Sequence, residues 1–129
     1  KDLEKQRRLQ VREDVYRLRR MANHFACPVV VGVQAKQRLE WHAGPNMMIP
    51  GIYDGEETSA IAQRIDRYIS MWMPKMTHTV GDSLHHGKVN FDVEENMLWV
   101  KVLKQRGGLP SGRAWKCYID FKRNEVKPE

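Results

Sequence analysis

The amino-acid sequence predicts a single α/β domain that ends in an antiparallel β-hairpin. Three features predict this class: an apolar stripe of helical period between residues 11 and 25, a continuous β-branched run at 29–33, and two apolar runs, 97–102 and 115–121, that flank a glycine-rich turn. The chain has 129 residues, of which 41% are hydrophobic, so it is long enough for one modest core and too short for two.

The composition favours anionic partners and argues against a membrane protein. Lysine and arginine total 22 against 16 for aspartate and glutamate, which leaves a net charge of +6 and suits nucleic acid or nucleotide phosphates. No apolar stretch approaches the roughly 18 to 20 residues of a membrane span, and no signal peptide precedes the first predicted strand, so we expect a soluble protein. Cys27 and Cys117 each sit in a hydrophobic run without the spacing of a zinc site, so we expect buried thiols in a reducing, cytoplasmic setting.

A helix that leads into a buried strand opens the predicted fold. Residues 1–10 are charged and lack apolar periodicity, so we expect a solvated segment or a frayed helix start. Pro28 cannot continue the helix, and the run Val-Val-Val-Gly-Val after it suits a strand covered on both faces, as in a parallel sheet. The helix itself is predicted by apolar residues that recur on one face: Val11, Val15, Leu18, Ala22 and Phe25.

The remainder of the chain alternates loops with short elements. Residues 35–57 contain glycines and prolines without a clear period and predict a long loop. Residues 57–66 predict a short helix, and residues 67–74 predict a strand that a proline closes. We expect residues 75–96 to be polar and irregular, ahead of the two strands of the hairpin.

Three polar side chains stand where ligands are commonly bound. Gln34 directly follows the predicted strand, at the carboxyl end where open α/β sheets place their ligands, and its amide suits an attacking water and a phosphate oxygen. Lys104 and Arg106 share one face of a strand tip if the strand continues, because residues two apart point the same way. Two such cations suit the charge that spreads over a phosphoryl group during transfer, the task of an arginine finger. The plainer interpretations stay open: a polar residue ending a strand for Gln34, and a solvated strand end for the cations.

In order and spacing these blocks resemble the carboxyl-terminal half of RecA-like hexameric ATPases, most closely the DnaB-like replicative helicases. The resemblance runs from about Val11 to Phe121: a helix and strand, a long loop, a middle block, and a Lys-x-Arg-x-Gly hairpin. Ala60 and Ile65 replace the usual glycine and alanine of the family's middle block, Ser-Gly-x-Ile-x-Gln-x-Ala-Asp. The residues that match this block, which is one position shorter here, are Ser59, Ile61, Gln63 and Asp66.

The resemblance implies a partial RecA-like sheet in a three-layer α/β/α arrangement, with residues 1–129 as the C-terminal half of one ATPase domain. It implies that Lys104 and Arg106 act in trans on ATP bound by the neighbouring subunit of a homo-oligomeric ring. Gln34 would link the terminal phosphate to the loop that follows, which would track single-stranded DNA. Lys36 and Arg38 are the candidate phosphate contacts of that loop. The implied parent is a bacterial or phage DNA helicase that hydrolyses ATP, with its role in replication, recombination or phage packaging left open.

Two motifs of such an ATPase are absent from the sequence. No G-x-x-x-x-G-K-[ST] phosphate loop is present, and no hydrophobic strand ends in the aspartate that helps to hold magnesium. We therefore expect the chain alone to be inactive and to bind neither ATP nor Mg²⁺, which belong to the intact parent. The phosphate-loop half would lie upstream or in another chain, and the bare edges of strand 29–33 predict close contact with a partner. The alternative is a self-contained basic α/β module that binds nucleic acid without NTPase activity, with all of its strands paired internally.

We predict no metal site. His78, Asp82, His85 and His86 lie in one polar segment, but adjacent histidines there point in different directions, and no second cluster supports them. We interpret the segment as a solvated loop.

Overall fold

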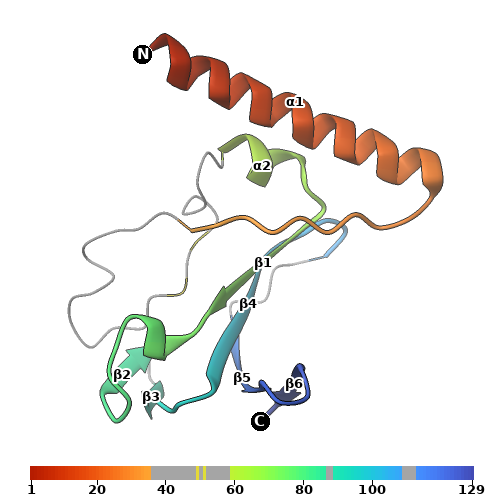
Figure 1. The fold of residues 1–129 in the computed structure, drawn as a ribbon. Helices are drawn as coiled ribbons and strands as arrows, with labels where there is room; N and C mark the ends of the chain where they lie inside the picture. Colours follow the sequence, from red (N-terminus) through yellow and green to blue (C-terminus); the bar gives the residue numbers. More distant parts are fainter. Residues whose placement is uncertain (36–48, 50, 52–58, 87–88, 109–112) are drawn as a thin grey trace.

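A long helix lies across one end of an antiparallel sheet (Figure 1). The computed structural model describes residues 1–35, 49, 51, 59–86, 89–108 and 113–129. The predicted class is confirmed at the level of mixed helix and sheet, and the finer three-layer arrangement stays a prediction. The elements of the described residues are α1 (Asp2–Phe25), α2 (Ser59–Arg64), β1 (Arg67–Trp72), η2 (Pro74–Met76), β2 (Ser83–His86), β3 (Val89–Asp92), β4 (Met97–Gln105), β5 (Ala114–Asp120) and β6 (Glu125–Pro128).

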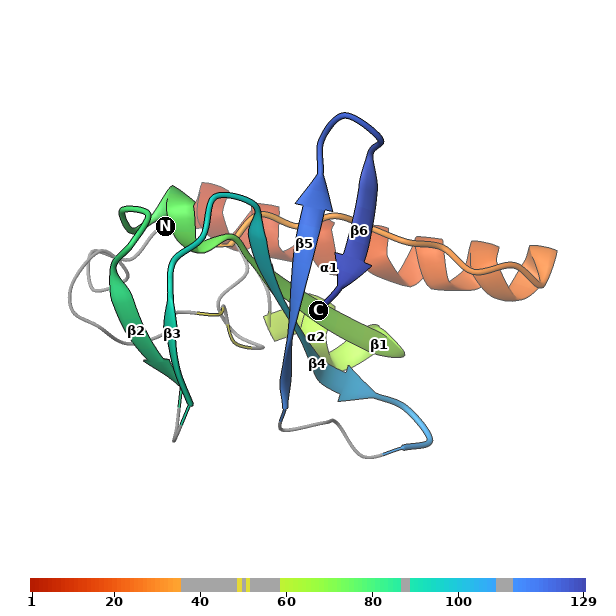
Figure 2. The same cartoon turned by 90° about the horizontal axis from the view of Figure 1, so that it is seen from below.

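The main sheet has four strands in the order β1-β4-β5-β6, all antiparallel to their neighbours. Figure 2 shows β4 between β1 and β5, with the β2–β3 pair to one side. The predicted strand at 67–74 and the predicted hairpin are confirmed, with Trp72 opposite Trp99 and Trp99 opposite Lys116. The strand β6 was not predicted, because it has only four residues, all of them exposed. A turn at Asn124, with a left-handed φ of 53°, folds it back onto β5.

The core lies on one face of this sheet, under the β2–β3 pair. Trp72, Met97 and Trp99 supply the sheet side, and Leu84 and Val93 supply the covering side. The expectation of an irregular segment at 75–96 is wrong, because Ser83–His86 and Val89–Asp92 form a two-stranded sheet. Each of these strands has only four residues, which is too short for an alternating apolar pattern to be recognised in the sequence.

Helix α1 begins earlier than the apolar stripe predicts. It starts at Asp2, and ion pairs one turn apart stabilise it: Arg8 lies 3.0 Å from Glu4, and Arg17 lies 3.4 Å from Glu13. It ends at Phe25 and is capped by Ala26, which is left-handed at φ 49°, so Pro28 falls outside it. The predicted stripe from position 11 to position 22 is half-buried, and no residue of α1 is fully buried.

The run at 29–33 is the main departure from the sequence-based fold. It is extended and belongs to no strand of the described sheets, and Val30 is 94% exposed. In Figures 1 and 2 the segment runs back along the length of α1. The prediction of a buried parallel strand is therefore wrong in this chain, since no described strand pairs with it. Cys27 is exposed and Cys117 half-buried, so the prediction of two buried thiols is also wrong.

Candidate phosphate-contacting site at the β4–β5 hairpin

Lys104 lies near the end of β4 and reaches helix α2. Its Nζ donates hydrogen bonds to the carbonyl oxygens of Ala62 and Gln63, at 2.7 and 3.4 Å. The last carbonyls of a helix have no partner within the helix and carry partial negative charge, so a lysine ammonium caps them favourably. Lys104 therefore fixes the end of β4 against α2.

Arg106 follows β4 directly and is held by Asp66, which lies between α2 and β1. The Arg106 backbone N–H donates to the Asp66 carbonyl at 2.7 Å, and its Nη1 lies 3.1 Å from Asp66 Oδ1. The two side chains are 50% and 64% exposed. An exposed ion pair of this kind contributes at most about 1 kcal/mol, so the guanidinium can exchange its partner at little cost.

Arg19 of α1 reaches the same carboxylate and was missed as a site residue. Its Nη1 donates to the Arg64 carbonyl at 2.8 Å, and its Nη2 lies 3.7 Å from Asp66 Oδ1. The available signal was its spacing: position 19 is four residues after Val15 and three before Ala22, which places it on the apolar stripe facing α2. Asp66 thus connects the long helix, the α2–β1 junction and the hairpin.

The turn after Arg106 begins with a glycine in a conformation that other residues rarely adopt. Gly107 has a φ of 76°, in the left-handed region. This geometry fixes the direction in which the chain leaves β4. The predicted turn at the tip continues through residues 109–112, outside the described part of the chain.

The other predicted site residues are not brought to this hairpin. Gln34 is exposed in the extended segment, and no hydrogen bond or ion pair joins it to Lys104 or Arg106. Lys36 and Arg38, the candidate DNA contacts, lie outside the described residues. The site visible in the structure therefore consists of Lys104, bound to carbonyls of α2, and Arg106, bound to Asp66.

The histidine-containing segment forms local hydrogen bonds. His78 Nδ1 lies 2.9 Å from Thr77 Oγ1, and His85 Nδ1 lies 2.9 Å from Asn90 Oδ1. Asp82 accepts the Thr79 backbone N–H at 3.0 Å. Over the residues that the structure describes, no three His, Cys, Asp or Glu side chains come together as metal ligands.

A second charged contact fixes the carboxyl terminus to β5. Lys116 Nζ lies 2.7 Å from Glu129 Oε1 and 5.6 Å from the centre of the Tyr118 ring. The hydrogen bond to Glu129 is the largest cause that raises the pKa of Lys116 above its usual 10.5. This ammonium is consequently charged throughout the neutral range.

Comparison with known proteins gives no match: no family model, no curated protein and no solved structure is similar to the chain. Within the described ranges, no helix combines the length and the apolar character needed to cross a membrane.

Proposed function

We propose that this chain is the C-terminal portion of an ATP-dependent DNA helicase with a RecA-like motor domain, and that its hairpin presents Arg106 and Lys104 to the triphosphate bound by a neighbouring subunit. The observation that carries the proposal is the position of Arg106. It stands at the end of a paired strand, half exposed, and its guanidinium is held by a carboxylate that is itself exposed. A stiff strand with an exchangeable arginine at its end suits delivery of that arginine to a ligand outside the chain.

Arg106 has the chemistry that phosphoryl transfer needs. Its guanidinium is permanently charged and binds two oxygens at once, and it exchanges an exposed carboxylate for phosphate oxygens with little loss of stability. An arginine supplied in trans in this way accelerates phosphoryl transfer by about 10³ to 10⁵-fold.

Lys104 is the companion cation. Its present acceptors are neutral carbonyls, and hydrogen bonds to ionised acceptors are about twice as strong, so a phosphate oxygen competes well for the ammonium. In the intact assembly, bound ATP would supply the phosphoryl group and Mg²⁺ would offset the charge on its oxygens. The two hairpin side chains would hold and orient that group.

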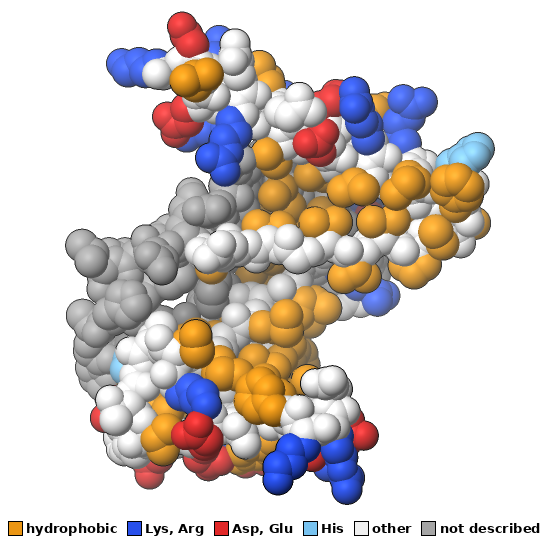
Figure 3. Space-filling model, in the orientation of Figure 1, with side chains coloured by type: hydrophobic (Ala, Val, Ile, Leu, Met, Phe, Trp, Pro, Cys, Tyr) orange, Lys and Arg blue, Asp and Glu red, His pale blue; other side chains and the backbone are white. Residues whose placement is uncertain are grey.

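Exposed apolar surface supports a neighbouring subunit. The extended run at 29–33 pairs with no strand among the described residues, and β1, at one end of the described sheet, exposes Ile69 by 56% and Met71 by 63%. Figure 3 shows hydrophobic side chains gathered across the middle of the face of the molecule that is in view, between α1 and the sheet. Apolar surface and free strand edges of this kind mark interaction sites. In the alternative, a self-contained nucleic-acid-binding module, every strand should pair within the chain. That alternative is therefore less well supported.

The proposal includes single-stranded DNA as the polymer on which the ring acts. Lys36 and Arg38 would contact its phosphates from the loop, and Gln34 would couple the terminal phosphate to that loop. The net charge of +6 agrees with a polyanionic partner.

The test is ATP turnover by the intact protein that contains this sequence, with single-stranded DNA present. Arg106→Ala should lower turnover by at least about 10³-fold, the range of an arginine finger, while nucleotide affinity changes only a few-fold. Arg123→Ala is the matched control, because Arg123 is 68% exposed and also faces an aspartate, Asp120, beside β5. Unchanged turnover in Arg106→Ala, or an intact protein that does not hydrolyse ATP, would overturn the proposal.

A further inference from the structure

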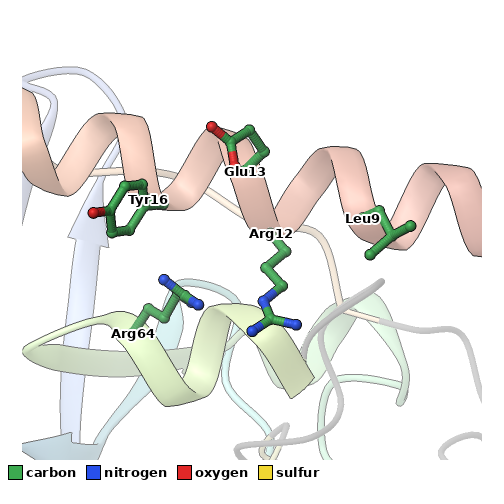
Figure 4. Close-up of a pocket in the computed structure, with 5 residues that line it drawn as sticks. All are labelled: Leu9, Arg12, Glu13, Tyr16 and Arg64. Atoms are coloured by element: carbon green, nitrogen blue, oxygen red, sulfur yellow. The ribbon is translucent and has the colours of Figure 1, made fainter.

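A hollow of about 450 Å³ lies between α1 and α2, and neither Lys104 nor Arg106 is among its lining residues. Its walls in the described residues are Leu9, Arg12, Glu13 and Tyr16 of α1 and Arg64 of α2. In Figure 4, Arg12 and Tyr16 extend from α1 toward α2, and Arg64 extends from α2 toward α1. Two guanidinium groups therefore face the same space from opposite walls.

The positive charge in this hollow is not neutralised by the nearby acidic residue. Glu13 points away from α2 and already lies 3.4 Å from Arg17 on its own helix. Arg12 has no ion-pair partner among the described residues. Arg64 lies over the ring of Tyr16, 5.4 Å from its centre, which orients the guanidinium without cancelling its charge.

The surrounding helix adds to the positive potential. Arg20 lies over the same tyrosine ring at 5.8 Å, so the ring has a cation from each helix beside it. The arginine side chains repel one another, and this repulsion lowers the stability of the folded chain. An anion bound between them would offset the repulsion.

We infer that this hollow binds a phosphate group of a nucleotide or of a nucleic-acid strand. Phosphate oxygens match the planar fork of a guanidinium, and the two arginines approach from opposite walls, so one phosphate is bound from both sides. A volume of about 450 Å³ is within the range of ligand pockets and leaves room for the rest of an ester beyond the phosphate.

The inference is independent of the proposed role of Arg106. Its residues lie on α1 and α2, and it concerns equilibrium binding of phosphate without turnover. Failure of one proposal therefore leaves the other standing.

The experiment measures binding by the full chain with three probes: a fluorescent 20-nucleotide oligo-dT, ATP, and inorganic phosphate as competitor. Arg12→Gln and Arg64→Gln should each weaken binding about tenfold, and for the oligonucleotide each should reduce the slope of log K against log salt by about 0.7 per lost phosphate contact. Arg12→Lys should be intermediate, because it keeps the charge and loses the fork.

The matched controls are Arg8→Gln and Arg123→Gln, which remove the same charge from exposed sites outside the hollow. Far-UV circular dichroism and the thermal midpoint check that every variant is folded. Loss confined to the oligonucleotide identifies a nucleic-acid backbone as the ligand, and loss confined to ATP identifies a nucleotide. Equal effects of the hollow variants and the controls, or no binding of any probe, would overturn the inference.

Discussion

Asp66 binds Arg106 through both its backbone and its side chain: its carbonyl accepts the Arg106 N–H at 2.7 Å, and its Oδ1 lies 3.1 Å from Arg106 Nη1. The backbone bond fixes the end of β4 at the start of β1, while the side-chain bond holds the guanidinium in a half-exposed position. The first bond is structural and the second is exchangeable. This division allows a rigid strand to present a guanidinium that remains available to a ligand.

The side-chain pair between Arg106 and Asp66 should contribute little to stability. In a double-mutant cycle of Arg106→Ala and Asp66→Ala, we expect a coupling energy of at most about 1 kcal/mol, because both side chains are at least half exposed. Urea unfolding of the four proteins measures it. A coupling above about 2 kcal/mol would mean that the guanidinium is committed to Asp66 and is not exchangeable.

The core at Met97 should be far more sensitive than the exposed sheet face. Met97 is 0% exposed, so Met97→Ala should lower the free energy of unfolding by about 2–5 kcal/mol through lost burial and the cavity left behind. Met71→Ala on β1, where the side chain is 63% exposed, is the control and should change it by less than about 0.5 kcal/mol. Similar losses for both would contradict the assignment of the core to the face under β2 and β3.

The contact between Lys116 and Glu129 predicts a pH dependence at the alkaline end. The folded pKa of Lys116 is raised above 10.5, so the stabilisation is complete below 10.5 and is lost as the pH rises through the folded value. Glu129→Gln should therefore lower stability by a constant amount between pH 7 and about 9, and this deficit should shrink at higher pH. Chemical unfolding across that range measures it.

Glu94→Gln is the control for that experiment, because Glu94 is exposed and makes no ion pair within the described residues. Its effect should not vary with pH in the same range. A Glu129→Gln deficit that grows above pH 10.5 would show that the sign of the Lys116 shift is wrong.

The exposed run at 29–33 should matter for assembly and not for folding of the chain. Val30→Asp alters a side chain that is 94% exposed, so the free energy of unfolding should change by less than about 0.5 kcal/mol. In the intact protein the same change should shift the mass measured by sedimentation toward smaller assemblies, because it places a charge in an apolar interface. Phe121→Asp, a 57% exposed position beyond β5, is the control. An unchanged oligomer in Val30→Asp would remove this run from the interface.

The sequence allowed prediction of those parts of the fold whose pattern is local. The stripe on α1 and the apolar strands around the glycine turn have clear periods, and both are present in the structure. Strands β2, β3 and β6 have four residues each, which is too short for a period to stand out. The run at 29–33 has the composition of a buried strand, but composition does not reveal whether a neighbouring strand is present to pair with it. Among the described strands, none pairs with this run.

The candidate site was predictable only in part. Strand alternation places Lys104 and Arg106 on one face only if the strand continues, and β4 ends at Gln105, before Arg106. It also does not show that Lys104 caps α2 or that Asp66 holds Arg106. Those contacts join residues about forty positions apart, and the position of α2 relative to β4 decides them. Arg19 could have been noticed, because its helical spacing places a charge on an apolar stripe.

Subunit mixing tests the central claim most directly. One population of the intact protein carries Arg106→Ala, and a second carries a mutation that abolishes nucleotide binding in its own site; each alone should be inactive. If Arg106 acts on a neighbour's triphosphate, mixed assemblies should recover ATP turnover, because some interfaces then combine an intact arginine with an intact nucleotide site. Absence of recovery in assemblies whose subunit exchange is verified by fluorescence transfer would contradict the account.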